Sequence, residues 1–567
     1  MADTINTDDV SFEGTASAVL HPGALEKEGR GDPVVHIDRL SIASPDGADR
    51  PFAVDRVSFK LFPGEMLCVV GESGSGKSMS ANALMGLLPD TVRVAQGRIL
   101  LGTTDLVTTP ADALYAIRGR RVAMIFQEPM SALDPLMKVS AQIEEVFEAH
   151  GLLTPKERKE KALSLLTEVG LPDPPRVAES YPFQLSGGQR QRVMIAMALA
   201  LEPEVLIADE PTTALDVTTQ AQILKLIAKL QKERNMAVMF ITHDFGVVAE
   251  IADYVSVMQL GRIVEQGTAE EVLFSPRHPY TKKLIAAIPR AGEGVKHVDD
   301  REPLLTVENL SKVYRMGTGL FSKVREVNAV KNVSFTLCRG ETLGIVGESG
   351  SGKSSVGRCL VRLQDPSSGR ILLGGQDMAH LKGEELRTMR RRMQMIFQDP
   401  YSSLNPREKV GRIIASGPIA YGEDEKKALA RAAELMEMVG LDPKATNRFP
   451  HEFSGGQRQR IGIARALALE PEIIIADEAV SALDVSIQAQ VLELLGQLKK
   501  DLDLSLVFIT HDLRVAAKIC DRVMVMQKGE VVELGNGNTI FDKPQHPYTK
   551  SLIEAIPGRA KEALMTA

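Results

Sequence analysis

The chain has 567 residues, of which 44% are hydrophobic and 25% are charged, proportions that are ordinary for a globular protein. Its 67 Lys and Arg against 74 Asp and Glu give a net charge of −7, which argues weakly against a nucleic-acid partner, since nucleic-acid-binding proteins usually carry a basic face or tail. No run approaches ~18 consecutive apolar residues, so we expect no membrane-spanning helix.

Neither the N-terminus nor the cysteines indicate export. Residues 1–33 hold no Lys or Arg before Lys27, which excludes a signal peptide and favours a polar, disordered tail. The four cysteines form no C-x-x-C pair. We therefore expect buried, reduced thiols in a reducing cytosol rather than a zinc or iron–sulfur cluster.

Two glycine-rich loops predict two phosphate sites. Residues 71–78 fit G-x-x-x-x-G-K-[ST], and the same eight residues recur at 347–354. Each copy follows an apolar strand and precedes a helix-compatible run, so backbone N–H groups and a helix N-terminus would surround the phosphates. The residues expected to bind nucleotide in these loops are Gly71, Ser73, Gly74, Gly76, Lys77, Ser78, Gly347, Ser349, Gly350, Gly352, Lys353 and Ser354.

Further landmarks recur in the same order, which predicts a duplicated α/β domain. Apolar runs around the motifs indicate a parallel sheet that is covered on both faces. Residues 128–185 and 399–453 lack such runs and carry helix-like patterns, so we expect a helical subdomain in each copy. The predicted organisation is a tail at 1–33, a first domain at 34–290, a linker at 291–303 and a second domain at 304–567.

Carboxylates at the ends of two apolar strands are candidates for metal and water chemistry. Lys77 would contact the β- and γ-phosphates, and the Ser78 hydroxyl would ligate Mg²⁺. Asp209 suits the same ion, and Glu210 could polarise an attacking water, a role whose loss typically costs about 10²–10⁴ in rate. The second copy offers the matching set Lys353, Ser354, Asp477 and Glu478.

A histidine and a glutamine complete each set. His243 follows a strand end, where a lone histidine is usually structural, but the recurrence of Ile-Thr-His-Asp at His511 favours a sensor of the γ-phosphate. Gln127 alone would carry no meaning. Its recurrence at Gln398 makes both glutamines candidates to sense the metal ion and the water.

The ordered motifs resemble the nucleotide-binding domains of ABC transporters, and S-G-G-Q is the discriminating one. The resemblance implies two tandem P-loop domains, each a RecA-like core with a helical subdomain, and ATP with Mg²⁺ as ligands. It also implies a head-to-tail arrangement in which the S-G-G-Q residues of one half close the ATP site of the other. The signature residues are Ser186, Gly187, Gly188 and Gln189 for the second site, and Ser454, Gly455, Gly456 and Gln457 for the first.

The residues that follow Gln127 and Gln398 resemble those of the dipeptide/oligopeptide importer subgroup. So do the C-terminal segments of the two halves, which carry His-Pro-Tyr-Thr at 278–281 and 546–549. In this subgroup two ATPases often form separate chains, whereas here they are fused, as in glutathione-type importers. The resemblance implies two membrane permeases as partners and, indirectly, a periplasmic substrate-binding protein. It places the chain peripherally at the cytoplasmic face of the inner membrane, attached through the permeases and without nucleic acid.

Two departures from the family pattern stand out. Tyr314 fills the place of the aromatic residue that stacks on adenine in the second half, whereas residues 40–44 of the first half offer no aromatic side chain. The first half has Asp-Glu-Pro where the second has Asp-Glu-Ala at 477–479, which changes loop stiffness more than chemistry. Because both halves keep every expected polar group, we expect both sites to hydrolyse ATP.

Two other functions compete with the importer. Twin-ABC translation factors that act on ribosomes also carry two such domains, but they usually join them by a long, basic, helical linker, and residues 289–303 are short and acidic. A DNA-repair or chromosome-organising ATPase would need coiled-coil or zinc insertions, and we find neither. The sequence does not identify the solute, which the permeases and the binding protein select.

Overall fold

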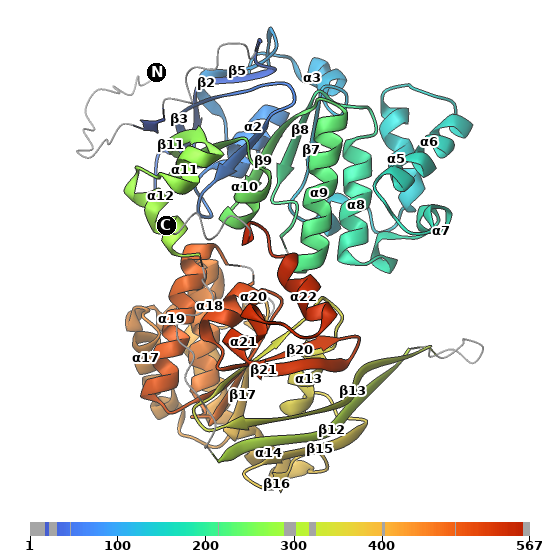
Figure 1. Ribbon diagram of the computed structural model, residues 1–567. Helices are drawn as coiled ribbons and strands as arrows, with labels where there is room; N and C mark the ends of the chain where they lie inside the picture. Colours follow the sequence, from blue (N-terminus) through green and yellow to red (C-terminus); the bar gives the residue numbers. More distant parts are fainter. Residues whose placement is uncertain are drawn as a thin grey trace. The chain divides into compact units, whose positions relative to one another are not determined.

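The computed structural model describes residues 18–21, 31–45, 47–213, 215–288, 302–316, 325–399, 403–481 and 483–559. The chain divides into two compact units (Figure 1): one holds the residues up to Pro211 and Leu226–Ala286, the other Thr212–Lys225 and Ala287–Arg559. The linker predicted at 291–303 lies mostly outside the described residues, since the first strand of the second half begins at Pro303. Each half contains one copy of the duplicated fold.

The first half contains two sheets. The central one has the strand order β1-β11-β10-β4-β9-β8-β7, and the second has the order β3-β2-β5-β6. The strands are β1 (Val19–Leu20), β2 (Val35–Ala43), β3 (Phe52–Leu61), β4 (Met66–Val70), β5 (Val94–Leu101), β6 (Thr104–Asp105), β7 (Val122–Ile125), β8 (Val205–Asp209), β9 (Ala237–Thr242), β10 (Tyr254–Gln259) and β11 (Arg262–Thr268).

The predicted parallel sheet is confirmed. Strands β4, β7, β8, β9 and β10 run parallel, and every residue of β4, β8 and β9 is buried, as continuous apolar runs require. Strand β4 lies between β9 and β10, with β8 and then β7 beyond β9. Parallel strands end at the same edge of their sheet, so the loops after β4, β7, β8 and β9 meet there.

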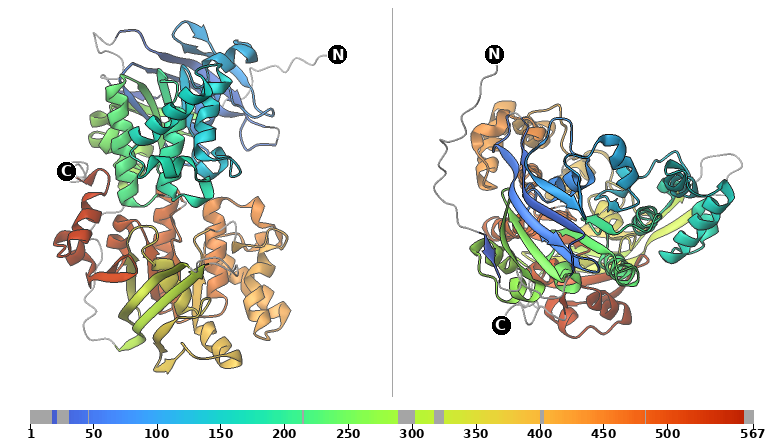
Figure 2. Two further views of the ribbon diagram at one scale, coloured as in Figure 1. Left: turned by 90° about the vertical axis from the view of Figure 1, so that its right-hand side faces the viewer. Right: turned by 90° about the horizontal axis from the view of Figure 1, so that it is seen from above.

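The helices of the first half are α2 (Lys77–Met85), α3 (Ala111–Ile117), α4 (Pro129–Ala132), α5 (Val139–Ala149), α6 (Pro155–Glu168), α7 (Pro174–Ala178), α8 (Gly187–Ala198), α9 (Val217–Glu233), α10 (Phe245–Ile251), α11 (Ala269–Phe274) and α12 (Pro279–Ala286). Helices α4 to α7 form the predicted helical subdomain, which projects to one side of the sheets (Figures 1 and 2). Helix α2 contacts β3, β7 and β8, so it lies between the two sheets and shares their core.

The second half repeats this architecture. Its sheets have the orders β17-β18-β19-β14-β20-β21 and β13-β12-β15-β16. The strands are β12 (Pro303–Met316), β13 (Arg325–Cys338), β14 (Thr342–Val346), β15 (Ser368–Leu373), β16 (Gln376–Asp377), β17 (Met393–Ile396), β18 (Ile473–Asp477), β19 (Ser505–Thr510), β20 (Arg522–Gln527) and β21 (Glu530–Asn536). The helices are α13 (Lys353–Leu360), α14 (Gly383–Arg392), α16 (Val410–Ala420), α17 (Glu425–Met438), α18 (Gly455–Leu467), α19 (Val485–Asp501), α20 (Leu513–Ile519), α21 (Gly537–Asp542) and α22 (Pro547–Glu554).

Alternation along β18 shows how the sheet is buried on both faces. Ile473 and Ile475 pack into the core shared with the antiparallel sheet, whereas Ile474 and Ala476 pack into the core formed with the helices.

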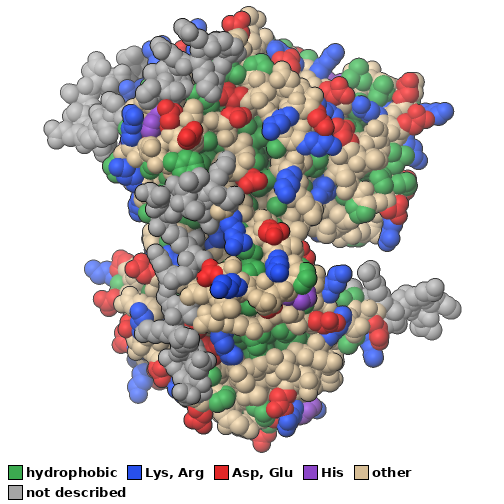
Figure 3. Space-filling model, in the orientation of Figure 1, with side chains coloured by type: hydrophobic (Ala, Val, Ile, Leu, Met, Phe, Trp, Pro, Cys, Tyr) green, Lys and Arg blue, Asp and Glu red, His purple; other side chains and the backbone are tan. Residues whose placement is uncertain are grey.

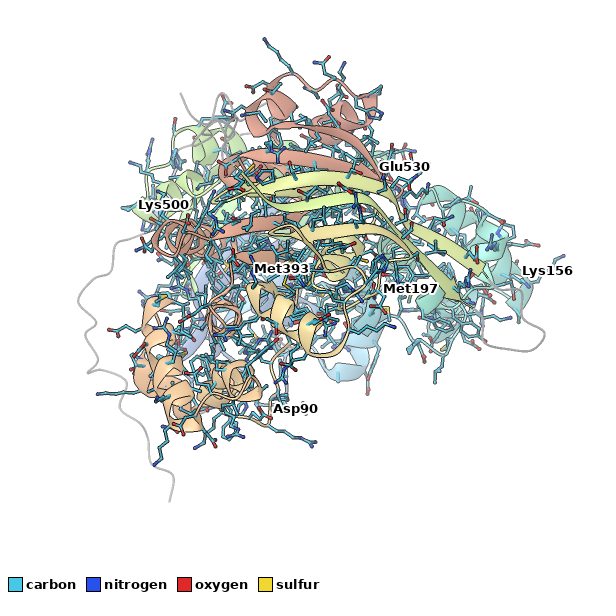
Figure 4. All side chains as sticks on the ribbon, turned by 90° about the horizontal axis from the view of Figure 1, so that it is seen from below. Asp90, Lys156, Met197, Met393, Lys500 and Glu530 are labelled. Carbon is cyan, nitrogen blue, oxygen red and sulfur yellow. The ribbon has the colours of Figure 1, made fainter. Side chains whose placement is uncertain are left out.

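In Figure 4, Met393 at the start of β17 lies inside this half and is 1% exposed, while Lys156 on α6 of the other half projects outward. The four-stranded antiparallel sheets were not predicted from the sequence.

The tail predicted as disordered over residues 1–33 contains an ordered segment. Val19 and Leu20 form β1, which pairs in parallel with Glu265 and Gln266 of β11. The next residue, His21, is buried, and its Nε2 lies 2.8 Å from Oε1 of Glu265. Residues 1–17 and 22–30 lie outside the described residues. The prediction is therefore wrong for residues 18–21, which a distant strand holds in place.

The charges on the surface and the burial of the cysteines agree with what the composition predicts. Basic and acidic side chains are interspersed on the visible face (Figure 3). Cys68, Cys359 and Cys520 are buried and Cys338 is partly buried, and all four are free thiols. Burial raises the pKa of the Cys359 thiol to about 11, which keeps it protonated. Within the described ranges, no helix combines the length and the apolar character that crossing a bilayer demands.

Candidate functional site

The loop after β4 has a backbone that only glycine fits. Gly71 has φ 154°, and a Cβ there would lie 2.2 Å from the carbonyl oxygen of Met258. At Gly347 in the second half, a Cβ would lie 2.3 Å from the carbonyl oxygen of Met526. Real atoms do not approach this closely, so both loops need glycine at their first position. The loops then start α2 and α13, whose first residues are Lys77 and Lys353.

Each lysine curls back over its own loop. Nζ of Lys77 donates to the carbonyl oxygens of Gly71 at 2.7 Å and Glu72 at 2.9 Å. The second half repeats the contacts, with Nζ of Lys353 at 2.7 Å from the oxygen of Gly347 and 2.8 Å from that of Glu348. Burial lowers the pKa of Lys353. These buried ammonium groups lie over the loop that would hold the phosphates.

A hydroxyl and a carboxylate meet beside each lysine. Oγ of Ser78 donates to Oδ1 of Asp209 at 3.0 Å, and Oγ of Ser354 donates to Oδ1 of Asp477 at 2.8 Å. Burial raises the pKa of both aspartates, and although the serine hydrogen bond lowers it, the neighbouring glutamate raises it further. Such a pair of hard oxygen donors is what Mg²⁺ takes from protein when phosphates and waters supply its other ligands.

The next glutamate is held in an uncommon conformation between two predicted partners. Glu210 has φ 45°, in the left-handed region, and Nε2 of Gln127 donates to its Oε2 at 2.9 Å. Nδ1 of His243 lies 3.3 Å from its Oε1. Strain of this kind in a non-glycine residue often marks a functional site.

The second half has the same arrangement around Glu478, which has φ 48°. Nε2 of Gln398 donates to its Oε2 at 2.6 Å, and Nδ1 of His511 lies 3.5 Å from its Oε1. Burial raises the pKa of Glu478, but the hydrogen bond and charge of His511 outweigh it, so this pKa lies below its usual value. The pKa of His511 is raised, because Glu478 outweighs the effect of burial. The carboxylate therefore stays ionised and can accept a proton.

The signature residues lie elsewhere, at the first turns of α8 and α18. Ser186 is the N-cap of α8, where its backbone N–H donates to Oε1 of Gln189 at 3.0 Å and its Oγ accepts from the Gln189 N–H at 3.3 Å. Ser454 and Gln457 form the same capping box. The two glutamine side chains thus stabilise a helix start, and their predicted role in binding nucleotide remains a prediction.

The residue predicted to stack on adenine lies next to α13. Oη of Tyr314 donates to Oγ of Ser355 at 3.3 Å, which places the ring beside the helix that follows the phosphate loop. Nζ of Lys312 lies 5.2 Å from the ring centroid. In the first half, where residues 40–44 offer no aromatic side chain, the Arg50 guanidinium donates to the carbonyl oxygen of Gly74 in the phosphate loop. That arginine was not predicted.

Two further residues that the sequence reasoning left out of the site are Tyr280 and Tyr548. Each hydroxyl accepts a hydrogen bond from the backbone of a phosphate loop. The signal was present, because both tyrosines belong to the recurring His-Pro-Tyr-Thr, which by itself indicates only a turn that opens a helix.

Comparison with known families agrees with this geometry. A family model described as "ABC transporter" matches residues 54–213 and 330–481, and one described as "Oligopeptide/dipeptide transporter, C-terminal region" matches residues 264–313 and 532–565. The first model covers both phosphate loops and both Asp-Glu pairs, and the second covers both tyrosines.

Curated relatives match over almost the whole chain. The glutathione import ATP-binding protein GsiA of Escherichia coli (strain K12) is 48% identical over 557 residues, which cover 92% of this chain and 89% of that protein. Proteins of the same name from Shigella dysenteriae and Shigella flexneri match equally well. Among solved structures, the ATP-binding cassette MJ0796 bound to ADP and Pi is 30% identical over 41% of this chain and 98% of its own, with a TM-score of 0.37. The protein cbiO1 from Clostridium perfringens is 26% identical over 47% of this chain and 100% of its own, with a TM-score of 0.39.

Proposed function

This chain belongs to the ABC transporter family of ATP-hydrolysing subunits, and we propose that it energises the import of glutathione or short peptides through a membrane complex. The observation that carries the proposal is the duplicated site, in which Ser, Asp, Glu, Gln and His converge twice beside a phosphate loop. The solute class comes from the curated relatives and from the C-terminal family model.

In the proposed reaction, a water attacks the γ-phosphate in line with the leaving oxygen. Glu210 and Glu478 are the groups that take a proton from that water, because each is held by a glutamine and lies near a histidine. The lysines of the two loops neutralise phosphate charge, and the loop N–H groups orient the nucleotide. His243 and His511 would report the presence of the γ-phosphate.

Mg²⁺ is the metal that these residues fit. Ser78 with Asp209, and Ser354 with Asp477, offer a hydroxyl and a carboxylate within hydrogen-bond distance of each other. Gln127 and Gln398, which donate to the glutamates that follow these aspartates, are further candidate ligands through their amide oxygens. When bound, the ion would neutralise charge on the β- and γ-phosphates.

We propose that ATP draws the two halves together and that hydrolysis releases them. The support is the family resemblance and the two glycines of each S-G-G, which have no Cβ to block an approach to phosphate. Moving such an equilibrium from 1:99 to 99:1 needs about 5.5 kcal/mol, or roughly 2.8 kcal/mol for each of two nucleotides that share it equally. This exchange would drive conformational change in the attached membrane subunits.

Exposed apolar side chains beside the first glutamine suit attachment to such subunits. Phe126, Met130 and Leu136, all between β7 and α5, are 40%, 45% and 85% exposed. Large apolar side chains that gather at a surface often mark protein interfaces. Two permeases and, through them, a periplasmic binding protein are the proposed partners, which would hold the chain at the cytoplasmic face of the inner membrane.

Affinity purification of the chain from detergent-solubilised cells, with identification of the bound proteins, tests this proposal. We expect two hydrophobic permease subunits. Ribosomes without permeases would contradict the proposal and support a translation factor instead.

The same affinity purification measures the effect of a substitution on the exposed apolar surface. Leu136→Glu should reduce permease recovery by about tenfold or more, because a charge would replace a side chain whose burial at an interface is worth about 1.5–3 kcal/mol. Leu260→Glu is the matched control, since Leu260 is also exposed, at 68%, but lies in the turn between β10 and β11. Equal recovery with both variants would exclude Leu136 from the interface.

A further inference from the structure

In each half, a tyrosine from the C-terminal region reaches the phosphate loop. Oη of Tyr280 on α12 accepts from the backbone N–H of Glu72 at 3.2 Å, and Oη of Tyr548 on α22 accepts from that of Glu348, also at 3.2 Å. Both tyrosines are more than nine-tenths buried. The contact therefore joins segments about 200 residues apart in the sequence, with separations of 208 and 200 residues in the two halves.

The peptide group that each tyrosine holds is one that the lysine also holds. The N–H of Glu72 and the carbonyl of Gly71 belong to the same planar peptide group, whose carbonyl oxygen accepts from Nζ of Lys77 at 2.7 Å. The tyrosine and the lysine therefore bind opposite edges of one planar peptide group. If the lysine turns toward bound phosphate, the tyrosine contact remains and keeps that peptide group, and the rest of the glycine-rich loop, in place.

The same set of contacts holds the tyrosine in place in each half. The carboxylate of Glu265 accepts from the backbone N–H groups of Arg277 and His278 at 2.7 and 3.1 Å, just before α12. Nδ1 of His278 then accepts from the N–H of Tyr280 at 3.2 Å. In the second half, Glu533, Gln545, His546 and Tyr548 make the same contacts.

The Tyr548 hydroxyl stays protonated under ordinary conditions. Burial is the main reason that the pKa of Tyr548 is raised to about 12. A neutral phenol can accept from the loop N–H and donate its own proton, and a hydrogen bond to the Glu348 side chain contributes to the same shift. The Tyr548 hydroxyl is therefore neutral when it accepts from the loop N–H at the pH values at which the protein would work.

We propose that Tyr280 and Tyr548 are positioning residues for nucleotide, through which the C-terminal region of each half sets the conformation of its phosphate loop. The inference rests on the ATP-binding part of the proposed function and is independent of the solute and of the permeases. It gives the His-Pro-Tyr-Thr segment a role in ATP affinity in addition to its role in opening a helix.

The test is the affinity for ATP and the steady-state kinetics of Tyr280→Phe, Tyr548→Phe and the double variant in the purified full-length chain. Loss of one hydrogen bond to the loop should raise the Kd and KM for ATP about threefold to tenfold at the affected site, with a smaller change in kcat. Tyr421→Phe is the control, because the exposed Tyr421 hydroxyl donates to the backbone carbonyl of Arg387 at 2.7 Å, and neither residue belongs to a phosphate loop. Its Kd should equal that of the unchanged protein.

A second pair of variants separates positioning from packing. Tyr280→Leu and Tyr548→Leu remove the ring as well as the hydroxyl and should lower the melting temperature, whereas the Phe variants should not. If the Phe variants bind ATP as the unchanged protein does and only the Leu variants are impaired, the tyrosines serve packing alone and the inference is overturned. If the unchanged protein binds no ATP, the proposed function itself fails.

Discussion

Replacing both Glu210 and Glu478 with Gln is expected to lower the steady-state rate of ATP hydrolysis by about 10²–10⁴, the usual cost of losing a positioned general base. Glutamine has nearly the same shape, but its amide accepts no proton from water. ATP binding should persist, because the phosphate loops and the Ser–Asp pairs are untouched. The measurement is phosphate release under saturating ATP, alongside the Kd for nucleotide.

The single variants and a control sharpen this result. Each single variant should lower turnover, since both halves hold the same groups, and Glu160→Gln on the exposed face of α6 should leave it unchanged. Unchanged turnover in Glu210→Gln or in Glu478→Gln would show that the corresponding site does not hydrolyse ATP. A double variant that still hydrolyses at the normal rate would place the general base elsewhere.

Substituting Ala for Gly71 and Gly347 together is expected to weaken ATP binding by about 10- to 100-fold. The added Cβ would lie 2.2 and 2.3 Å from backbone carbonyl oxygens that belong to buried strands, so the loop rather than the strand must shift. Forcing atoms into such a space typically costs 1–3 kcal/mol, and each 1.4 kcal/mol changes affinity tenfold. Calorimetric titration with a non-hydrolysable ATP analogue measures the effect.

The control is the pair Gly47→Ala and Gly375→Ala. These glycines also have positive φ, 84° and 83°, but a Cβ there would meet nothing within 4 Å. Neither glycine belongs to a phosphate loop. They should cost some stability and leave the Kd for ATP unchanged. Equal loss of affinity in both pairs would mean that backbone strain in general, and not the close approach at the loop, explains the effect.

Much of the site could be predicted because its chemistry sits in short contiguous motifs. The loop glycines, the Asp-Glu pairs and the histidines each follow a buried strand, and parallel strands bring their ends to one edge of the sheet. The recurrence of every motif then favoured these residues as candidates over accidental matches. The structure adds that Gln127 and His243 each contact the carboxylate of Glu210, an arrangement that the motifs alone did not specify.

The remaining features depend on contacts that no local pattern encodes. Tyr280 reaches the loop only because β10 pairs with β4 and β11, which leads toward α12, pairs with β10. Its sequence context indicates nothing more than a helix start. Strand β1 has only two residues and is held by its pairing with β11. The polar sequence around it carries no sign of this pairing and therefore predicts a disordered tail. Arg50 lies in a turn whose position follows from the antiparallel sheet, which was itself not predicted.

ATP-dependent uptake tests the central claim most directly. The chain, co-purified with its membrane partners, would be reconstituted in liposomes together with the binding protein, with ATP on the side of the chain and labelled glutathione or dipeptide on the other. We predict accumulation of label that requires ATP and disappears in the Glu210→Gln, Glu478→Gln double variant. ATP hydrolysis at the normal rate without accumulation of either solute would contradict the account of this chain as the ATPase of a peptide or glutathione importer.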